Sequence, residues 1–217
     1  LLASGKNDPG GILRSRIHAT QRFAAVDNYD DEKANEVLKV LAKNETWQIP
    51  TLALYRSTRI KENFANLPDS IRIKWENGLK AMENQEPSPE RTKYTDWMLM
   101  MTGKIHQNKI GIMAGTDTPI GFLTPGLSLH EELSQLVEGG MSPLEALETA
   151  TLNPAIYFNL ETELGWIGQN TWADLVILNA NPLDRIGNTK QIDAVIKQGN
   201  YFDRNILNQT LEEVRKN

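Results

Sequence analysis

The sequence predicts an α/β protein in which a large first region is followed by a small β unit. Segments with apolar residues at helical spacing alternate with two short, β-branched, apolar segments over residues 1–160. Strand-like segments separated by Asn, Asp, Gly and Pro fill residues 161–203, and residues 204–217 predict an exposed terminal helix. Of the 217 residues, 40% are hydrophobic and 24% are charged, which is typical of a globular chain.

Charge and composition exclude several classes of protein. The formal net charge is −5, whereas phosphate-binding surfaces need clustered Lys and Arg, so we expect no nucleic-acid partner. The chain has no cysteine, which excludes disulfides, thiolate zinc sites and a cysteine nucleophile. No apolar run approaches the roughly 18 residues that cross a bilayer, so we expect no membrane partner. The first residues lack the basic leader and apolar core of a secretory signal, and the compartment stays open.

Capping residues and breakers mark the helices of the first region. Ser88 precedes Pro89 and Ser142 precedes Pro143, and a capping serine followed by proline typically begins a helix. Ser128 is expected to cap the helix that starts at Leu129. No helix or strand is assigned to residues 55–88. The expected helices cover residues 13–23, 30–43, 89–108, 129–138, 144–151 and 153–159.

Two segments of the first region are expected to be buried strands. Residues 46–54 are short, β-branched and aromatic, although Pro50 cannot donate to a strand ladder. The segment over residues 111–116 is short, and its apolar residues lie between Gly111 and Gly115. Strand-like segments of the β unit are expected at residues 165–168, 173–178, 194–197 and 201–202.

The segment Thr116-Asp117-Thr118 is the strongest candidate for chemistry. A carboxylate that directly follows an apolar strand and precedes a Gly/Pro loop lies where barrel enzymes keep catalytic groups. Such a carboxylate can ligate a cation or take a proton from bound water. The alternative is an ordinary helix cap or turn former, and position alone leaves both readings open.

Other motifs give little support to rival chemistries. The three histidines, His18, His106 and His130, lie far apart and form no HxH or HExxH pair, and the chain has no GxSxG, Walker or GxGxxG motif. His106 suits the C-terminal end of a long helix, where a cationic imidazole is favourable. Glu131 and Glu132 are expected to serve the first turn of their helix, and Asp174 is expected to be structural.

Several ordered motifs together resemble the amidohydrolase superfamily, nearest to imidazolonepropionase-like and Xaa-Pro-dipeptidase-like metal-dependent hydrolases. The likeness is dense over residues 104–203 and looser over residues 30–54. It is carried by Ala114-Gly115-Thr116-Asp117, Ser128–Leu133, Gly139–Leu147, Ala150–Ala155, Leu164–Ile167, Ala173–Leu178, Asn181-Pro182-Leu183 and Val195–Gly199.

The resemblance implies a fold and a site. Such proteins are (β/α)₈ barrels that carry one or two divalent metal ions, with zinc expected, beside a small β-sandwich built from both chain ends. Residues 46–54 and 111–116 would be the seventh and eighth strands, and residues 161–203 the C-terminal strands of the sandwich. Asp117 would be a metal ligand and the proton acceptor for the attacking water. Thr116, Thr118 and His130 would support that ligand or contact a small-molecule substrate, although for His130 a polar contact at the start of its helix is an equal alternative.

The resemblance also implies that much of the site lies outside this chain. The family's HxH pair, its bridging lysine or glutamate and its later histidines have no counterpart here and would lie before residue 1. Asn170-Thr171-Trp172 also replaces the usual glycine-lysine before Ala-Asp-Leu. We therefore expect the C-terminal portion of a longer hydrolase of C–N bonds in cyclic amides, amides or dipeptide-like substrates. With one matched ligand, this chain alone is expected to hold no catalytic metal.

Two alternatives remain open at this stage. The chain could be a non-catalytic remnant that self-associates as a homo-oligomer, because the apolar surface left by missing strands must be covered. It could instead belong to a deaminase of the same superfamily, since the substrate loops that separate these activities would precede residue 1.

Overall fold

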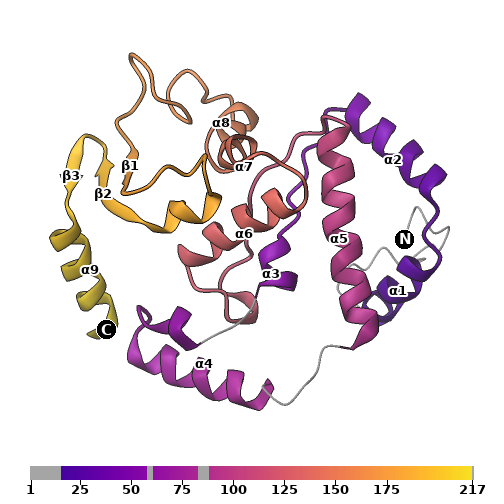
Figure 1. Ribbon diagram of the computed structural model, residues 1–217, viewed down its shortest axis with the longest axis horizontal. Coiled ribbons are helices and arrows are strands. Elements are labelled where there is room, and N and C mark those ends of the chain that lie inside the picture. The colour runs from indigo at the N-terminus through magenta and orange to yellow at the C-terminus, as the bar shows by residue number, and fades with distance from the viewer. Residues whose placement is uncertain (1–15, 58–60, 83–87, 217) are drawn as a thin grey trace.

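Helix α5 (Pro89–Gln107) organises this computed structural model, which describes residues 16–57, 61–82 and 88–216. Ser88 begins the helix as expected, because its side chain accepts the Arg91 N–H at 3.2 Å and Pro89 occupies the first position. Helices α1 (Arg16–Asp27) and α2 (Asp31–Lys43) lie on one side of α5, and α3 (Leu52–Arg56) and α6 (Leu127–Glu138) lie on the other (Figure 1). The predictions for α2 and α5 are confirmed.

The remaining helices extend this layer. α7 (Pro143–Ala150) packs on α6 and is followed by α8 (Leu152–Tyr157), and a capping box between Ser142 and Glu145 begins α7. α1 confirms a helix near the predicted one, although residues 13–15 lie outside the described residues. The short 3₁₀ turns cover Lys61–Phe64, Ile120–Phe122 and Ile186–Lys190.

Helix α4 (Asp69–Met82) was not expected from the sequence. Arg72 pairs with Asp69 one turn before it and Glu76 one turn after it, which supports an exposed helix. Trp75 also packs edge-on against Phe64, with ring centroids 5.4 Å apart, so α4 has an apolar contact as well. The sequence analysis missed α4 because charged and turn residues are mixed with the apolar ones over residues 55–88.

The β unit is a three-stranded antiparallel sheet in the order β1-β2-β3 (Figure 1). The strands are β1 (Leu175–Leu178), β2 (Ile192–Lys197) and β3 (Asn200–Phe202), and α9 (Arg204–Lys216) packs on β2 and β3. Gln198 and Gly199 both have positive φ, as a two-residue hairpin turn requires. Three of the four expected strand segments and the terminal helix are confirmed, whereas residues 165–168 form no strand.

The two expected strands of the first region are much shorter than predicted. Their only ladder contact among the described residues is an isolated parallel bridge between Gln48 and Ile112. The predicted strand over residues 46–54 is wrong at its end, because Leu52 begins α3 after Thr51 adopts a left-handed conformation with φ 50°. The expected strand over residues 111–116 is reduced to that single bridge, and further along the segment the Ala114 N–H donates to Thr149 O rather than to a strand.

The main core lies where α3, α6 and α7 meet residues 111–116. Its buried members include Leu52, Ile112, Leu133, Leu136 and Ala146. Ser128 does not cap α6 as expected, because Gly126 takes the N-cap position and Ser128 is buried inside the helix.

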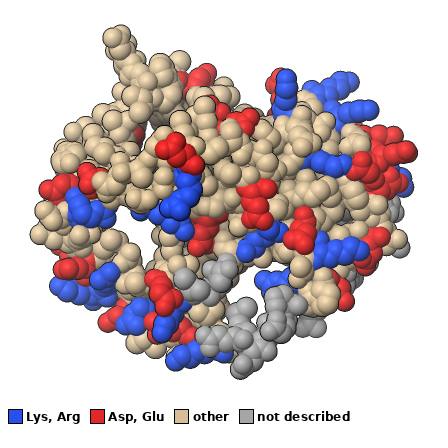
Figure 2. Space-filling view, viewed as in Figure 1, with Lys and Arg blue, Asp and Glu red and all other residues tan. Residues whose placement is uncertain are grey.

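Charged side chains of both signs are interspersed over the face shown in Figure 2. Within the described ranges, no helix combines the length and apolar character that crossing a membrane requires.

Gly103 of α5 offers a test of the α5–α6 packing. A Cβ atom at this position would lie 2.6 Å from the backbone oxygen of Gly139, which follows α6. Gly103→Ala should therefore lower the free energy of unfolding by about 1–3 kcal/mol, although alanine has the higher helix propensity. Urea unfolding measures this change. Arg91→Ala, at an exposed position of the same helix, is the control, and equal stability of the two variants would contradict the packing.

Candidate functional site

The candidate site lies where two extended segments, the first around Gln48 and the second around Ile112, end side by side. The Gln48 N–H donates to Gly111 O at 2.9 Å, and the Met113 N–H donates to Gln48 O at 3.0 Å. These bonds define a parallel pair, so the C-terminal ends of both segments lie at the same edge. A Cβ atom at Gly115 would clash with the Ile49 side chain, so glycine is required for this approach.

Asp117 stands at the end of the second segment with an exposed side chain. Its backbone is left-handed, with φ 53°, an uncommon conformation that concentrates at functional sites. Its carbonyl accepts the Ile120 N–H at 2.9 Å, whereas its carboxylate makes no hydrogen bond or ion pair with the described residues. The carboxylate is therefore available to a ligand.

The threonines on either side of Asp117 shape the loop. The Thr118 hydroxyl donates to Leu123 O at 2.6 Å, and the Thr118 N–H donates to Thr116 Oγ1 at 3.3 Å. The structure thus brings Thr116 and Thr118 together with Asp117. Their printed bonds hold the loop, and contact with substrate stays a prediction.

Glu132 of α6 is the residue of this region that the sequence analysis missed. It was expected to serve the first turn of its own helix, but its side chain is fully buried, with 0% exposed. One carboxylate oxygen, Oε2, accepts the Ala53 N–H at 2.6 Å. Burial, and to a lesser degree the charge of Asp117, raise the pKa of Glu132 to about 7 against the opposing effect of the backbone N–H groups of Ala53 and Leu52.

A signal for Glu132 was present in the sequence. Glu132 precedes buried Leu136 by one helical turn and is adjacent to buried Leu133, so it belongs to the buried face of α6. Glu131, by contrast, accepts a hydrogen bond from Asn63 Nδ2 at 3.2 Å. An acidic residue on the apolar face of an amphipathic helix was thus the pattern to look for.

The histidines are dispersed, as the sequence predicted. His130 Nδ1 lies 3.0 Å from Thr189 Oγ1, and burial together with the charge of Lys190 lowers its pKa. His106 Nε2 lies 3.4 Å from Glu145 Oε1. The side chain of His18 lies outside the described residues. The geometry gives His130 a partner next to α6, and its contact with a substrate stays a prediction.

The described residues do not by themselves form a zinc site. They contain no group of three or more His, Asp or Glu side chains that could hold a metal ion. A catalytic zinc ion takes three protein ligands and a water molecule. Asp117 can therefore be one donor of such a site and not the whole of it.

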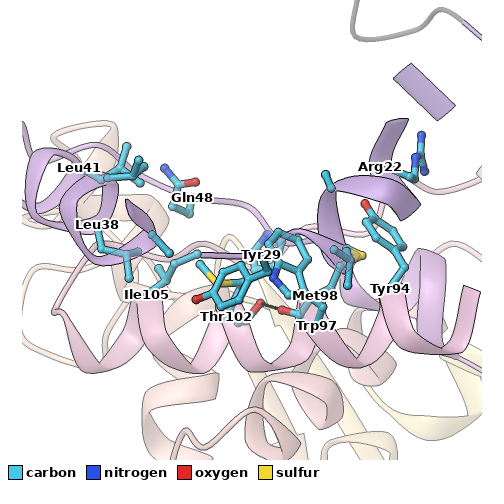
Figure 3. Close-up of a pocket in the computed structure, with 16 residues that line it drawn as sticks. Arg22, Tyr29, Leu38, Leu41, Gln48, Tyr94, Trp97, Met98, Thr102 and Ile105 are labelled. Carbon is cyan, nitrogen blue, oxygen red and sulfur yellow. Dashed lines mark hydrogen bonds between the residues drawn. The ribbon is translucent and has the colours of Figure 1, made fainter. Parts of the chain in front are cut away.

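A cavity of about 470 Å³ lies between α1, α2 and α5 and is separate from Asp117 (Figure 3). Aromatic and aliphatic side chains line it, among them Tyr29, Leu38 and Trp97, and Gln48 and Pro50 of the first extended segment also face it. Trp97 Nε1 is buried without a hydrogen-bond partner among the described residues.

Comparison with known proteins decides the family. The model of the amidohydrolase family matches residues 16–201 of this chain. The chain belongs to the amidohydrolase family.

Solved structures agree with this assignment at the level of the fold. A Xaa-Pro dipeptidase with bound methionine in its active site is 22% identical with a TM-score of 0.56, covering 77% of this chain and 37% of its own. A putative prolidase from Bifidobacterium longum is 26% identical with a TM-score of 0.51, covering 77% of this chain and 39% of its own. An A. niger ochratoxinase is 24% identical with a TM-score of 0.52, covering 77% and 34%.

The chain therefore spans less than half the length of these solved relatives. No curated protein matches it. The similarity indicates that this chain corresponds to part of an amidohydrolase barrel. Its described residues are mostly helical, with one small antiparallel sheet.

The raised pKa of Glu132 predicts a pH-dependent stability. Its folded-state pKa of about 7 exceeds its ordinary value of 4.5, so the folded state binds the proton more tightly. The contribution of Glu132 to stability, measured relative to Glu132→Gln, should thus be fully present below pH 4.5 and fall by roughly 3 kcal/mol as the pH rises to 8. Urea unfolding from pH 4.5 to 8 measures the difference, with Glu131→Gln as control. A pH-independent difference between Glu132→Gln and wild type would contradict the burial of an ionisable carboxyl.

Proposed function

We propose that this chain supplies the Asp117 part of a metal-dependent hydrolase that acts on C–N bonds in cyclic amide, amide or dipeptide-like substrates. The observation that carries the proposal is the exposed, unpaired carboxylate of Asp117 at the edge where the two parallel segments end. Membership of the amidohydrolase family and the likeness to dipeptidases support the reaction class.

Asp117 would act as the proton carrier of the reaction. A carboxylate within hydrogen-bond reach of the attacking water can accept its proton, and the resulting acid can return the proton to the leaving nitrogen. Thr116 and Thr118 would hold the loop that presents this carboxylate, through the bonds described above. The loop from Pro119 to Leu127 would border the substrate.

Asp117 would also serve as one metal ligand. The site would hold one or two divalent ions, with zinc as the expected metal. Ligands from outside this chain would complete the coordination, because the described residues lack a set of three ligands. The proposal therefore concerns the activity of a longer protein that contains this chain.

We also propose a partner, the remaining part of the barrel. The Ile112 carbonyl accepts a hydrogen bond from Asn153 Nδ2 at 2.8 Å, and the Ala114 N–H donates to Thr149 O at 2.9 Å, so these two groups have partners within this chain. On the first extended segment, Ile49 is 53% exposed and its backbone bonds no described residue. A further parallel strand would add there, next to the apolar cavity.

Asp117→Asn tests the reaction role. In the protein that joins this chain to the rest of the barrel, the variant should reduce kcat for amide or dipeptide hydrolysis by at least 100-fold, because the general base is lost. Asp174→Asn is the matched control, since Asp174 pairs with Lys197 and bonds the Gln198 N–H in the β unit. Unchanged hydrolysis by Asp117→Asn would refute the role.

Metal analysis tests the partner. The purified chain alone should contain no stoichiometric zinc, whereas the chain joined or co-expressed with the remaining barrel should bind one or two ions per molecule. Elemental analysis after gel filtration measures both. A zinc-free dimer of this chain that fails to associate with the remaining barrel would instead support the self-associating remnant.

A further inference from the structure

The buried carboxyl of Glu132 joins the two segments that form the candidate site. Glu132 lies on α6, 79 residues after Ala53, and its Oε2 accepts the Ala53 N–H in the first turn of α3 at 2.6 Å. The first turn of a helix leaves such N–H groups without partners in the helix itself. Glu132 therefore caps a helix that is distant in sequence.

Burial of this carboxyl costs desolvation free energy. Glu132 is fully buried and forms no ion pair with a described Lys or Arg side chain. Its second oxygen, Oε1, and the hydroxyl of Ser128 one turn earlier are buried without hydrogen-bond partners among the described residues. A neutral apolar side chain would fill the space without the desolvation of a carboxyl, so packing alone does not account for glutamate at this position.

The Glu132 bond lies beside a strained turn. Thr51 immediately precedes Leu52 and has φ 50°, a conformation that is unfavourable for a β-branched residue. The surrounding structure must enforce it, and the Glu132 carboxyl binds the backbone two residues further along the chain, at Ala53.

This turn lies next to the segment that carries Asp117. The Thr51 Cγ2 atom would lie 3.6 Å from a Cβ atom built at Gly115, which is two residues before Asp117. Glu132, the turn at Thr51 and the end of the Asp117 segment are therefore close neighbours.

We propose that Glu132 is a positioning residue, whose carboxyl clamps the Thr51–Ala53 turn to α6 and thereby fixes the place of Asp117. The assignment of a role to Asp117 rests on the proposed function, whereas the clamp itself can be observed in the isolated chain. Glu132 touches no reacting atom in this account.

Nuclear magnetic resonance of the isotope-labelled chain tests the clamp without any substitution. A through-hydrogen-bond coupling should connect the Ala53 amide nitrogen to the Glu132 carboxyl carbon. Its absence from a spectrum that resolves the other backbone couplings would overturn the clamp.

Two substitutions separate the hydrogen bond from the charge. Glu132→Gln and Glu132→Leu both remove the charge, but only glutamine retains an acceptor for the Ala53 N–H. Amide exchange at Ala53 should accelerate at least 10-fold in Glu132→Leu and less than 3-fold in Glu132→Gln. Glu131→Leu, on the same helix, should leave this amide unchanged.

The signals of Asp117 decide between a positioning role and a purely local one. In Glu132→Leu the carboxyl carbon and amide signals of Asp117 should shift away from the values that Glu132→Gln retains. Faster exchange at Ala53 with identical Asp117 signals in both variants would overturn the positioning role. These readouts need no turnover, so failure of the positioning role is distinguishable from failure of the proposed hydrolase activity, which Asp117→Asn tests.

Discussion

The parallel contact between the two extended segments is the constraint on which the site depends. Two backbone hydrogen bonds at Gln48 hold the segments together, which is little for a pair of strands. Close packing supplies the rest, because Gly111 admits the Trp47 ring and Gly115 admits the Ile49 side chain. The bonds give the direction of the pair, and the glycines allow its spacing. Together they bring the end of one segment beside the end of the other.

Two acidic residues at this place have opposite environments. Asp117 is exposed and its carboxylate is unpaired, whereas Glu132 is buried and binds a backbone N–H group. Burial raises the pKa of Glu132 to about 7, and the charge of Asp117 contributes to this rise. The contrast is consistent with the two proposals, in which the exposed carboxylate of Asp117 binds the ligand and the buried carboxyl of Glu132 fixes the turn at Thr51.

Features set by local chemistry were predictable from the sequence. Helices α2, α5 and α7 follow from capping residues and periodic apolar positions, and the strands of the β unit follow from short apolar segments between turn residues. The family and the candidate Asp117 came from ordered motifs, and the matching family model confirms the family.

Features set by distant contacts were not predictable from local sequence. The first turn of α3 bonds Glu132, 79 residues later than Ala53, and the local sequence does not show this contact, so residues 46–54 were wrongly expected to be one strand. Helix α4 packs Trp75 against Phe64 and Phe122, which are also distant contacts. Glu132 is a mixed case: its place on the apolar face of α6 could be read from the sequence, whereas the backbone N–H that it binds could not.

The most direct measurement is anomalous diffraction from crystals of the protein that contains this chain together with the remaining barrel, grown with zinc. The account predicts an anomalous peak about 2.0–2.2 Å from a carboxylate oxygen of Asp117, with further ligands from outside this chain. A fully ordered barrel in which the zinc peak lies away from Asp117, or in which no zinc binds, would contradict it.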